Sequence, residues 1–302
     1  MPAKGQDRSA FLPLPASACE AALYPDPIPN ILTIAGTDPS GGAGIQADIK
    51  TFSALGAYAC SAITAVVAQN TQGVRSFVAL DPAFVADQID AVLEDVRIDA
   101  VKIGMIANAA IAEAVADRLR HHRVRNVVLD PVMVAKSGHA LLDPQAVEAV
   151  RARLVPLATV LTPNLPEAAV LLDRADHWTA ADMDAALPDL LAMGPEWVLL
   201  KGGHLEGSAE STDLLAGAQG ITAFAAPRIA THNDHGTGCT LSSAIAALLP
   251  SLGVVGAVGA AKTYLHGALS TADRLEVGRG HGPVHHFHAL WPSAGVPVDL
   301  PA

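Results

Sequence analysis

NDHGTGCTLSS, residues 233–243, joins a glycine-rich loop to the start of an apolar helical pattern. Leu241, Ile245 and Leu248 recur at the spacing of one helix face, which predicts a helix opened by the two glycines. The first turn of a helix leaves about four N–H groups unpaired and carries roughly half a positive charge, and glycine lets a phosphate approach them. Gly236, Thr237 and Gly238 are therefore predicted to bind an anion, although these residues alone would equally allow a plain helix cap.

Cys239 falls in the first turn of this predicted helix. A helix N-terminus stabilises a thiolate, so we expect the pKa of Cys239 to lie below the free value of about 8.5. The alternative is a small buried cysteine that only packs.

Short apolar runs alternate with amphipathic helices over the rest of the chain. Strands are predicted at 30–35, 58–67, 100–103, 126–129, 159–161 and 197–200, and two weaker ones at 213–215 and 221–225 form an antiparallel edge. Helices are predicted from about 45 to 55, at 82–96, 109–121, 144–154 and 180–193, after 165, and in two pieces after 236. This alternation predicts an α/β fold with a mostly parallel sheet covered on both faces.

Composition limits the organisation and the partners. The chain is 51% hydrophobic and 16% charged, which suits one large core, and its net charge of −11 argues against nucleic acid or an anionic membrane as partner. Cys19, Cys60 and Cys239 are few and far apart, which favours reduced thiols in the cytoplasm. Residues 245–261 are apolar but interrupted by Pro250 and glycines, so no membrane span is expected. We expect a disordered extension over 1–29, one domain over 30–291 and a tail over 292–302.

Polar residues follow nearly every predicted strand. They are 36–38 (GTD), 69–70 (QN), 104–105 (GM), 130–131 (DP), 162–164 (TPN) and 201–203 (KGG). Ligands of parallel α/β sheets bind beyond the carboxyl ends of the strands, so these residues are predicted to form one binding site.

Two acids and a lysine in this set suit phosphate chemistry. Asn164 and Glu167 have capping-box spacing, for which a helix cap and a metal site are comparable interpretations. Asp130 follows a strand and has no such capping role. Paired acids near a phosphate site suit Mg²⁺ held largely through water, and Lys201 would neutralise phosphate oxygens.

Several stretches together resemble the hydroxymethylpyrimidine/phosphomethylpyrimidine kinases of thiamine biosynthesis, which belong to the ribokinase-like superfamily. The stretches are 32–56, 67–73 (VAQNTQG), 102–105 (KIGM), 130–138 (DPVMVAKSG), 161–167 (LTPNLPE), 201–204 (KGGH), 235–241 (HGTGCTL) and 281–288 (HGPVHHFH). They occur in the family's order across residues 30–291.

The resemblance implies a ribokinase-like three-layer fold and the transfer of phosphate from ATP, with Mg²⁺, to the hydroxymethyl group of the pyrimidine. A second transfer to the monophosphate would give the diphosphate. It also implies small-molecule partners and a homodimer.

The resemblance assigns roles residue by residue. Polar atoms of the pyrimidine would be bound by Gly36, Asp48 and Gln69, and the ring would lie between Val67, Met105 and Val132. Cys239 takes the position of the aspartate base of most ribokinase relatives, beside the anion hole of Gly236, Thr237 and Gly238. The nucleotide would be bound by Asn164, Lys201 and Lys262, and the metal by Asp130 and Glu167. Without the family match, Asp48 and Lys262 could each be an ordinary solvated helix residue.

Other functions remain compatible with the sequence. A pyridoxal kinase also phosphorylates a ring-bound hydroxymethyl group, and a pyrimidine sensor could keep the pocket without turnover. A thiol enzyme using Cys239 as nucleophile lacks a convincing base, because His235 lies on the loop. The histidines at 281, 285, 286 and 288 have spacing that could suggest zinc, but packing is the better interpretation.

Overall fold

The computed structural model describes residues 27–133, 142–205 and 208–291. The strands are β1 (Asn30–Ala35), β2 (Tyr58–Ile63), β3 (Ala65–Asn70), β4 (Gly73–Ala79), β5 (Ala100–Ile103), β6 (Val127–Leu129), β7 (Val160–Leu161), β8 (Trp197–Leu200), β9 (Glu210–Gly217) and β10 (Gly220–Pro227). The α-helices are α2 (Gly44–Ala54), α3 (Pro82–Leu93), α4 (Ala109–His121), α5 (Pro144–Ala149), α6 (Leu165–Leu171), α7 (Ala180–Ala192) and α8 (Thr237–Ser270).

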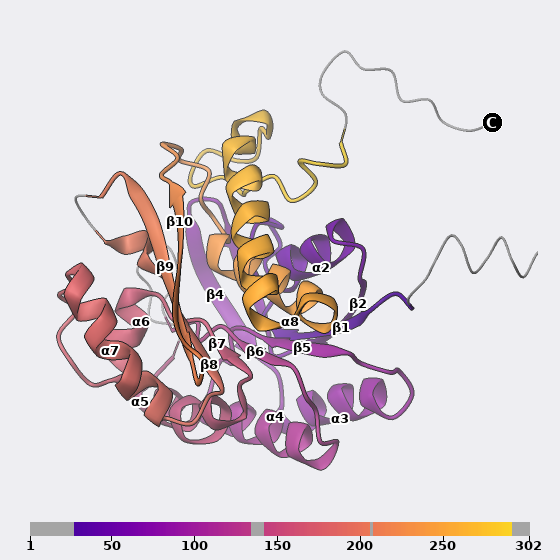
Figure 1. Ribbon diagram of the computed structural model, residues 1–302. Helices are drawn as coiled ribbons and strands as arrows, with labels where there is room; N and C mark the ends of the chain where they lie inside the picture. The colour runs from indigo at the N-terminus through magenta and orange to yellow at the C-terminus, as the bar shows by residue number, and fades with distance from the viewer. Residues whose placement is uncertain (1–26, 134–141, 206–207, 292–302) are drawn as a thin grey trace, which may run out of the picture.

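The main sheet has the strand order β10-β9-β8-β7-β6-β5-β1-β2. Neighbouring strands from β2 to β8 are parallel, whereas β9 and β10 are antiparallel to their neighbours. The predicted mostly parallel sheet with an antiparallel edge is therefore confirmed (Figure 1).

Helices cover both faces of this sheet, with α3, α4 and α5 on one face and α2 and α8 on the other (Figure 1). Successive side chains of a strand point to opposite faces, and β1 shows the result. Leu32 and Ile34 belong to the apolar core that includes α3 to α7, while Ile31 belongs to the core under α2 and α8. The two cores make the molecule a three-layer α/β structure, as predicted.

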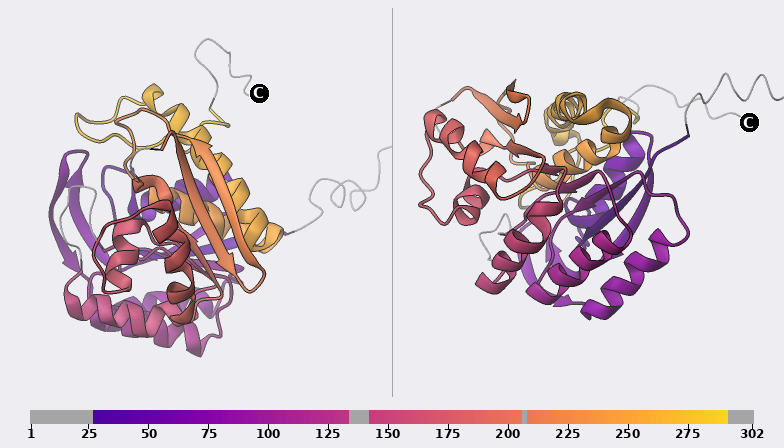
Figure 2. Two further views of the ribbon diagram at one scale, coloured as in Figure 1. Left: turned by 60° about the vertical axis from the view of Figure 1, so that its left-hand side comes forward. Right: turned by 60° about the horizontal axis from the view of Figure 1, so that its bottom comes forward.

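The segment 58–67, predicted as one buried strand, is two strands in different sheets. β2 ends at Ile63, and β3 begins at Ala65 and pairs with β4 as an antiparallel hairpin. Both pieces are apolar and only Thr64 separates them, so the hydrophobic pattern shows no break. The hairpin stands apart from the main sheet (purple ribbon at the left of the left-hand view in Figure 2) and carries Val67 and Gln69.

Helix α8 contains the two helical pieces predicted after residue 236, joined at Gly253, whose φ of 65° and ψ of 176° are not helical. By length and composition α8 passes as a membrane-crossing helix among the described residues. Its first half, however, packs into the core through Leu241, Ala244 and Ile245. The predicted helix 144–154 is confirmed as α5 followed by a wider π-type turn over Val150–Leu154.

Candidate active site

A cavity of about 1080 Å³ lies where the parallel strands end. It collects residues that follow β1, β5, β6, β7 and β8, together with the β3–β4 hairpin and the start of α8. Fourteen of the fifteen predicted site residues line it: Gly36, Val67, Gln69, Met105, Asp130, Val132, Asn164, Glu167, Lys201, Gly236, Thr237, Gly238, Cys239 and Lys262. Asp48 is the exception.

The glycine-rich loop opens α8 as predicted. Gly236 has a φ of 79° and a Cβ placed there would collide with the carbonyl oxygen of Gly42, so only glycine fits. The helix begins at Thr237, and its first N–H groups belong to residues that line the cavity. The structure thus directs the positive end of α8 into the cavity.

The predicted low pKa of Cys239 is wrong. Burial raises the pKa of the thiol to about 11, and Asp48 and Asp130 add to the rise. Lys102 and a hydrogen bond from the Gly44 backbone act in the opposite direction without compensating. A helix N-terminus lowers the pKa of a thiol only when its stabilisation of the thiolate is larger than the cost of burying that charge.

Asp130, Lys201 and Glu167 meet on the cavity wall. Lys201 Nζ lies 2.9 Å from Asp130 Oδ1 and 3.9 Å from Glu167 Oε2. Although burial alone would raise it, Lys201 and Lys102 hold the pKa of Asp130 below its ordinary value. Burial raises the pKa of Glu167 to about 7, with Lys201 opposing the rise and Asp130 adding to it.

Asn164 and Glu167 form the capping box that their spacing allows. Asn164 Oδ1 accepts the Glu167 backbone N–H at 2.8 Å, and Glu167 Oε2 accepts the Asn164 backbone N–H at 2.8 Å. The cap at the start of α6 orients both residues while they line the cavity. A helix cap and a position in the site are therefore compatible.

Apolar and polar residues expected to contact the pyrimidine line the same cavity. They are Gly36, Val67, Gln69, Met105 and Val132. A Cβ at Gly36 would lie 3.1 Å from Met105 Sδ, so the glycine keeps this part of the cavity open. These residues come from separate segments of the chain and suit a planar ring with polar edges.

Known proteins that are similar in sequence include kinases of a pyrimidine substrate. The family model of phosphomethylpyrimidine kinase matches residues 38–285. The chain belongs to the phosphomethylpyrimidine kinase family. It is 62% identical to the hydroxymethylpyrimidine/phosphomethylpyrimidine kinase of Salmonella typhimurium, over 87% of this chain and 98% of that one.

Relatives of known structure share the fold of this kinase. A phosphomethylpyrimidine kinase from Clostridium difficile is 41% identical, with a TM-score of 0.70, and the match covers 79% of this chain and 98% of that one. A pyridoxal kinase from Staphylococcus aureus, solved with AMP-PCP and pyridoxal, is 30% identical with a TM-score of 0.80 over 88% of this chain and 96% of that one. Ribokinase-like kinases of both substrates thus have this architecture.

Asp48 lies beneath the cavity of the kinase rather than on its wall. Its side chain is fully buried and accepts hydrogen bonds from Thr33, Lys102 and Ser243. Lys102 and the two hydroxyl partners were absent from the predicted site. The signal for Lys102 was a lysine inside β5, whose other residues are apolar and which is buried throughout.

Lys262 forms an ion pair within the protein. Its Nζ lies 2.6 Å from Asp213 Oδ2, and Asp213 Oδ1 accepts the backbone N–H of Gly202 at 2.9 Å. Asp213, which sequence reasoning missed, therefore ties Lys262 to the turn that follows Lys201.

Asp38 and His235 join the two loops that precede α2 and α8. His235 Nε2 lies 2.8 Å from Asp38 Oδ2, and the same oxygen accepts the Ala43 backbone N–H at 2.8 Å. Although burial alone would raise it, the hydrogen bonds from His235 and Ser40 hold the pKa of Asp38 well below its ordinary value. The sequence pattern marks Asp38 only as a polar residue after a strand.

The C-terminal histidines of the kinase make packing and hydrogen-bond contacts. His286 Nε2 lies 3.1 Å from Thr240 Oγ1, and the rings of His285 and His288 contact Trp291 and Tyr264. Burial lowers the pKa of His286 to about 3, which keeps its ring neutral.

Proposed function

We propose that the protein uses ATP to phosphorylate hydroxymethylpyrimidine and then its monophosphate, giving the diphosphate used in thiamine biosynthesis. The main support is that one cavity is lined by three groups of residues. They are the residues expected to contact the ring, the Gly236–Gly238 loop, and the cluster of Asp130, Glu167 and Lys201. Family membership and the 62% identity to the hydroxymethylpyrimidine/phosphomethylpyrimidine kinase of Salmonella typhimurium support the same function.

The chemistry that this cavity supports is in-line phosphoryl transfer. The substrate hydroxyl oxygen forms a bond to the γ-phosphorus of ATP while the bond to the leaving ADP breaks, and the hydroxyl proton passes to the thiolate of Cys239. The N–H groups at the start of α8 and the ammonium of Lys201 stabilise the charge on the transferred group. Because the thiol pKa is about 11, the thiolate is a minor but strongly basic form near neutral pH.

Mg²⁺ fits the carboxylates on the cavity wall as an ion held largely through water. Asp130 accepts hydrogen bonds from Thr162, Lys201 and Ser242, which leaves it about one of four acceptor sites, whereas Glu167 accepts the Asn164 backbone N–H and keeps sites for water molecules around the ion. Burial is the largest cause of the raised pKa of Glu167, and Lys201 opposes that rise without cancelling it. When bound, the cation would add positive charge and neutralise phosphate oxygens.

Pyridoxal is the second candidate substrate, because pyridoxal kinases superpose on the chain with a TM-score of 0.80. Sequence identity favours the pyrimidine, since those neighbours are 30–32% identical and the curated pyrimidine kinases of Salmonella typhimurium and Rhizobium meliloti are 62% and 53% identical.

The test is ATP-to-ADP turnover with Mg²⁺ on hydroxymethylpyrimidine, its monophosphate and pyridoxal in parallel. Turnover with both pyrimidines and much less with pyridoxal is expected. Preference for pyridoxal would overturn the substrate, and absence of turnover on all three would favour a pyrimidine sensor. Cys239→Ala should reduce turnover about 10²–10⁴-fold, whereas Cys19→Ala and Cys60→Ala should not.

The proposal also covers the oligomeric state of the protein and its location in the cell. Residues 30–291 would form the kinase domain, and two copies would form a homodimer in the cytoplasm. The exposed apolar pair Val66 and Val78, which face each other across β3 and β4, supports association through the hairpin.

A further inference from the structure

The hydrogen-bond partners of Asp48 leave it little capacity to bind a substrate. Thr33 Oγ1 donates to Oδ2 at 2.6 Å, Ser243 Oγ donates to Oδ1 at 2.6 Å, and Lys102 Nζ lies 2.9 and 3.0 Å from the two oxygens. A carboxylate offers about four acceptor sites, and these contacts occupy them. The function of Asp48 therefore lies in what it holds.

Lys102 is the charged group that Asp48 holds. It lies on β5 with no exposed surface, yet it is part of the cavity floor. A Cβ at Gly104 would lie only 2.8 Å from Lys102 Nζ, so the glycine leaves room for the ammonium. A buried cation is costly unless it is paired, and such an arrangement in a cavity is typical of functional charges.

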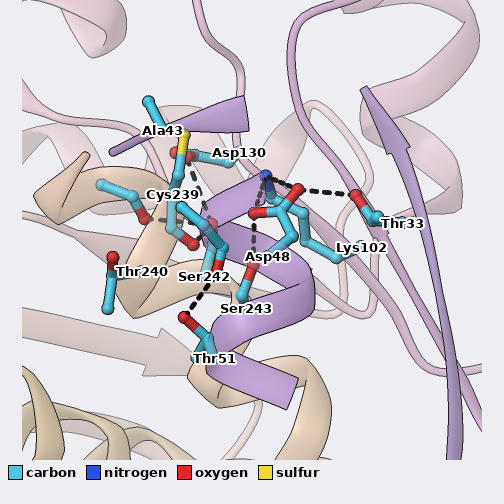
Figure 3. Close-up of polar contacts among 12 residues, drawn as sticks. Thr33, Ala43, Asp48, Thr51, Lys102, Asp130, Cys239, Thr240, Ser242 and Ser243 are labelled. Carbon is cyan, nitrogen blue, oxygen red and sulfur yellow. Dashed lines mark hydrogen bonds and ion pairs between the residues drawn. The ribbon is translucent and has the colours of Figure 1, made fainter. Parts of the chain in front are cut away.

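The network reaches helix α8 one turn after Cys239. Ser243 follows Cys239 by four residues and therefore lies on the same helix face. Figure 3 shows Cys239, Ser243, Asp48 and Lys102 grouped together, with polar contacts joining Asp48 to Lys102 and Ser243. The contact from Ser243 to Asp48 fixes this face of α8 relative to the lysine.

The charged groups around Cys239 come from several elements. They are Lys102 on β5, Asp48 on α2, Asp130 after β6 and Lys201 after β8, and the Gly44 N–H at the start of α2 bonds to the thiol. Of these, Lys102 acts most strongly to lower the pKa of Cys239, against burial and the two acids.

We propose that Lys102 is a positioning residue for phosphoryl transfer, fixed by Asp48 so that its ammonium stabilises the negative charge on the Cys239 sulfur. The proposal rests on the proposed role of Cys239 as the base. Asp48 serves the reaction only through Lys102 and does not contact the pyrimidine.

The reactivity of Cys239 toward iodoacetamide tests this directly, because the thiolate is the reacting form. The rate is measured at pH 8.5 in a Cys19→Ala/Cys60→Ala chain, alongside the melting temperature. Lys102→Met should slow alkylation about tenfold or more, since a nearby cation is lost. Asp48→Asn should slow it less than Lys102→Met, because the lysine remains, although no longer held by a carboxylate, and an anion that raises the thiol pKa is removed. If Asp48 and Lys102 had only a structural role, either substitution would loosen the site and speed alkylation of Cys239.

Turnover provides the second readout. Lys102→Met should lower kcat strongly and leave the KM for the pyrimidine unchanged. Lys50→Met is the control, because Lys50 bonds to the Gly41 carbonyl and lies outside the network. It should alter neither the alkylation rate nor kcat. Wild-type alkylation and kcat in a folded Lys102→Met variant would overturn the proposal. A raised pyrimidine KM in Asp48→Asn would also overturn it, because Asp48 would then contact the substrate.

If Lys102→Met does not fold, a second variant can still test the proposal. Asp48→Asn/Lys102→Met removes both charges of the buried pair, which proteins tolerate better than one unpaired charge. Because Asp48 itself raises the pKa of Cys239, the double variant is compared with Asp48→Asn: slower alkylation than in Asp48→Asn supports the proposal, and an equal rate contradicts it. Full turnover in Cys239→Ala would refute the base itself, while the alkylation rates would still report whether Lys102 acts on the thiol.

Discussion

Individual ionisable residues in this kinase show properties that depend on burial more than on local position. Cys239 stands at a helix N-terminus and beside Lys102, yet its pKa is raised to about 11 because burial and two acids dominate. Glu167 stands in a helix first turn and near Lys201, yet its pKa is about 7, because burial and the neighbouring Asp130 raise it. Both groups should therefore respond to pH within an accessible range.

The pH dependence of turnover should report Cys239. A raised thiol pKa means that the thiolate fraction grows about tenfold per pH unit below 11. We expect kcat/KM for hydroxymethylpyrimidine to rise from about pH 7.5 to 9 with a slope near one on logarithmic axes. Cys239→Ser should remove most activity and the slope. A flat profile in the wild-type enzyme would contradict the assignment of Cys239 as base.

The stability of the ligand-free protein should depend on Glu167. Its folded pKa of about 7 exceeds the ordinary value of 4.5, so the stability that it contributes is complete below pH 4.5 and is lost as pH rises through 7. Glu167→Gln keeps an acceptor for the capping box and removes this loss. At pH 8 the variant should gain about 1–3 kcal/mol of stability relative to its effect at pH 5.

Melting temperatures at pH 5 and pH 8 measure this difference. Glu148→Gln is the matched control, because Glu148 is exposed and pairs only with Arg151 among the described contacts. An equal effect of Glu167→Gln at both pH values would show that Glu167 is ionised throughout the range.

At the scale of elements, the entry to α8 depends on the contact between two loops. Gly236 and Gly56 both have a φ of 79°, but a Cβ at Gly236 would meet the Gly42 backbone, whereas one at Gly56 would meet nothing within 4 Å. Gly56→Ala should cost about 1–2 kcal/mol for its backbone conformation alone. Gly236→Ala should cost more and should also reduce turnover, because the loop must move away from residues 42–43.

Urea unfolding and turnover of the two variants provide the comparison. Equal stability and equal activity would show that the Gly236 loop tolerates a displacement without consequence for the anion hole.

For the whole molecule, the proposed homodimer would form through the β3–β4 hairpin. Val66 and Val78 are 50% and 67% exposed, and a cross-strand apolar pair on an isolated hairpin favours association. Val78→Asp should convert a dimer to a monomer in sedimentation velocity. Val255→Asp, on the exposed side of α8, is the control. Dissociation by Val255→Asp in place of Val78→Asp would locate the interface on α8.

Periodicity and residue order along the chain predict the layers of the molecule and most of the cavity wall. Strand and helix periodicity follow from which side chains are buried, and parallel strands bring their carboxyl ends to one edge. The order of the residues along the chain was therefore enough to predict that Asp130, Lys201 and the Gly236–Gly238 loop share one site. The cap formed by Asn164 and Glu167 could also be predicted, because it is a purely local motif. The division of 58–67 into two strands escaped this reasoning, because both strands are apolar and only their pairing differs.

How the charged groups act on one another became visible only in the folded molecule. Asp48 and Lys102 are 54 positions apart and Asp48 and Ser243 are 195 apart, so no local pattern shows that Asp48 has its acceptors occupied. The pKa of Cys239 likewise depends on desolvation and on acids from α2 and the end of β6. Electrostatic free energies vary with burial and with distance through space, and those quantities exist only once the chain is folded.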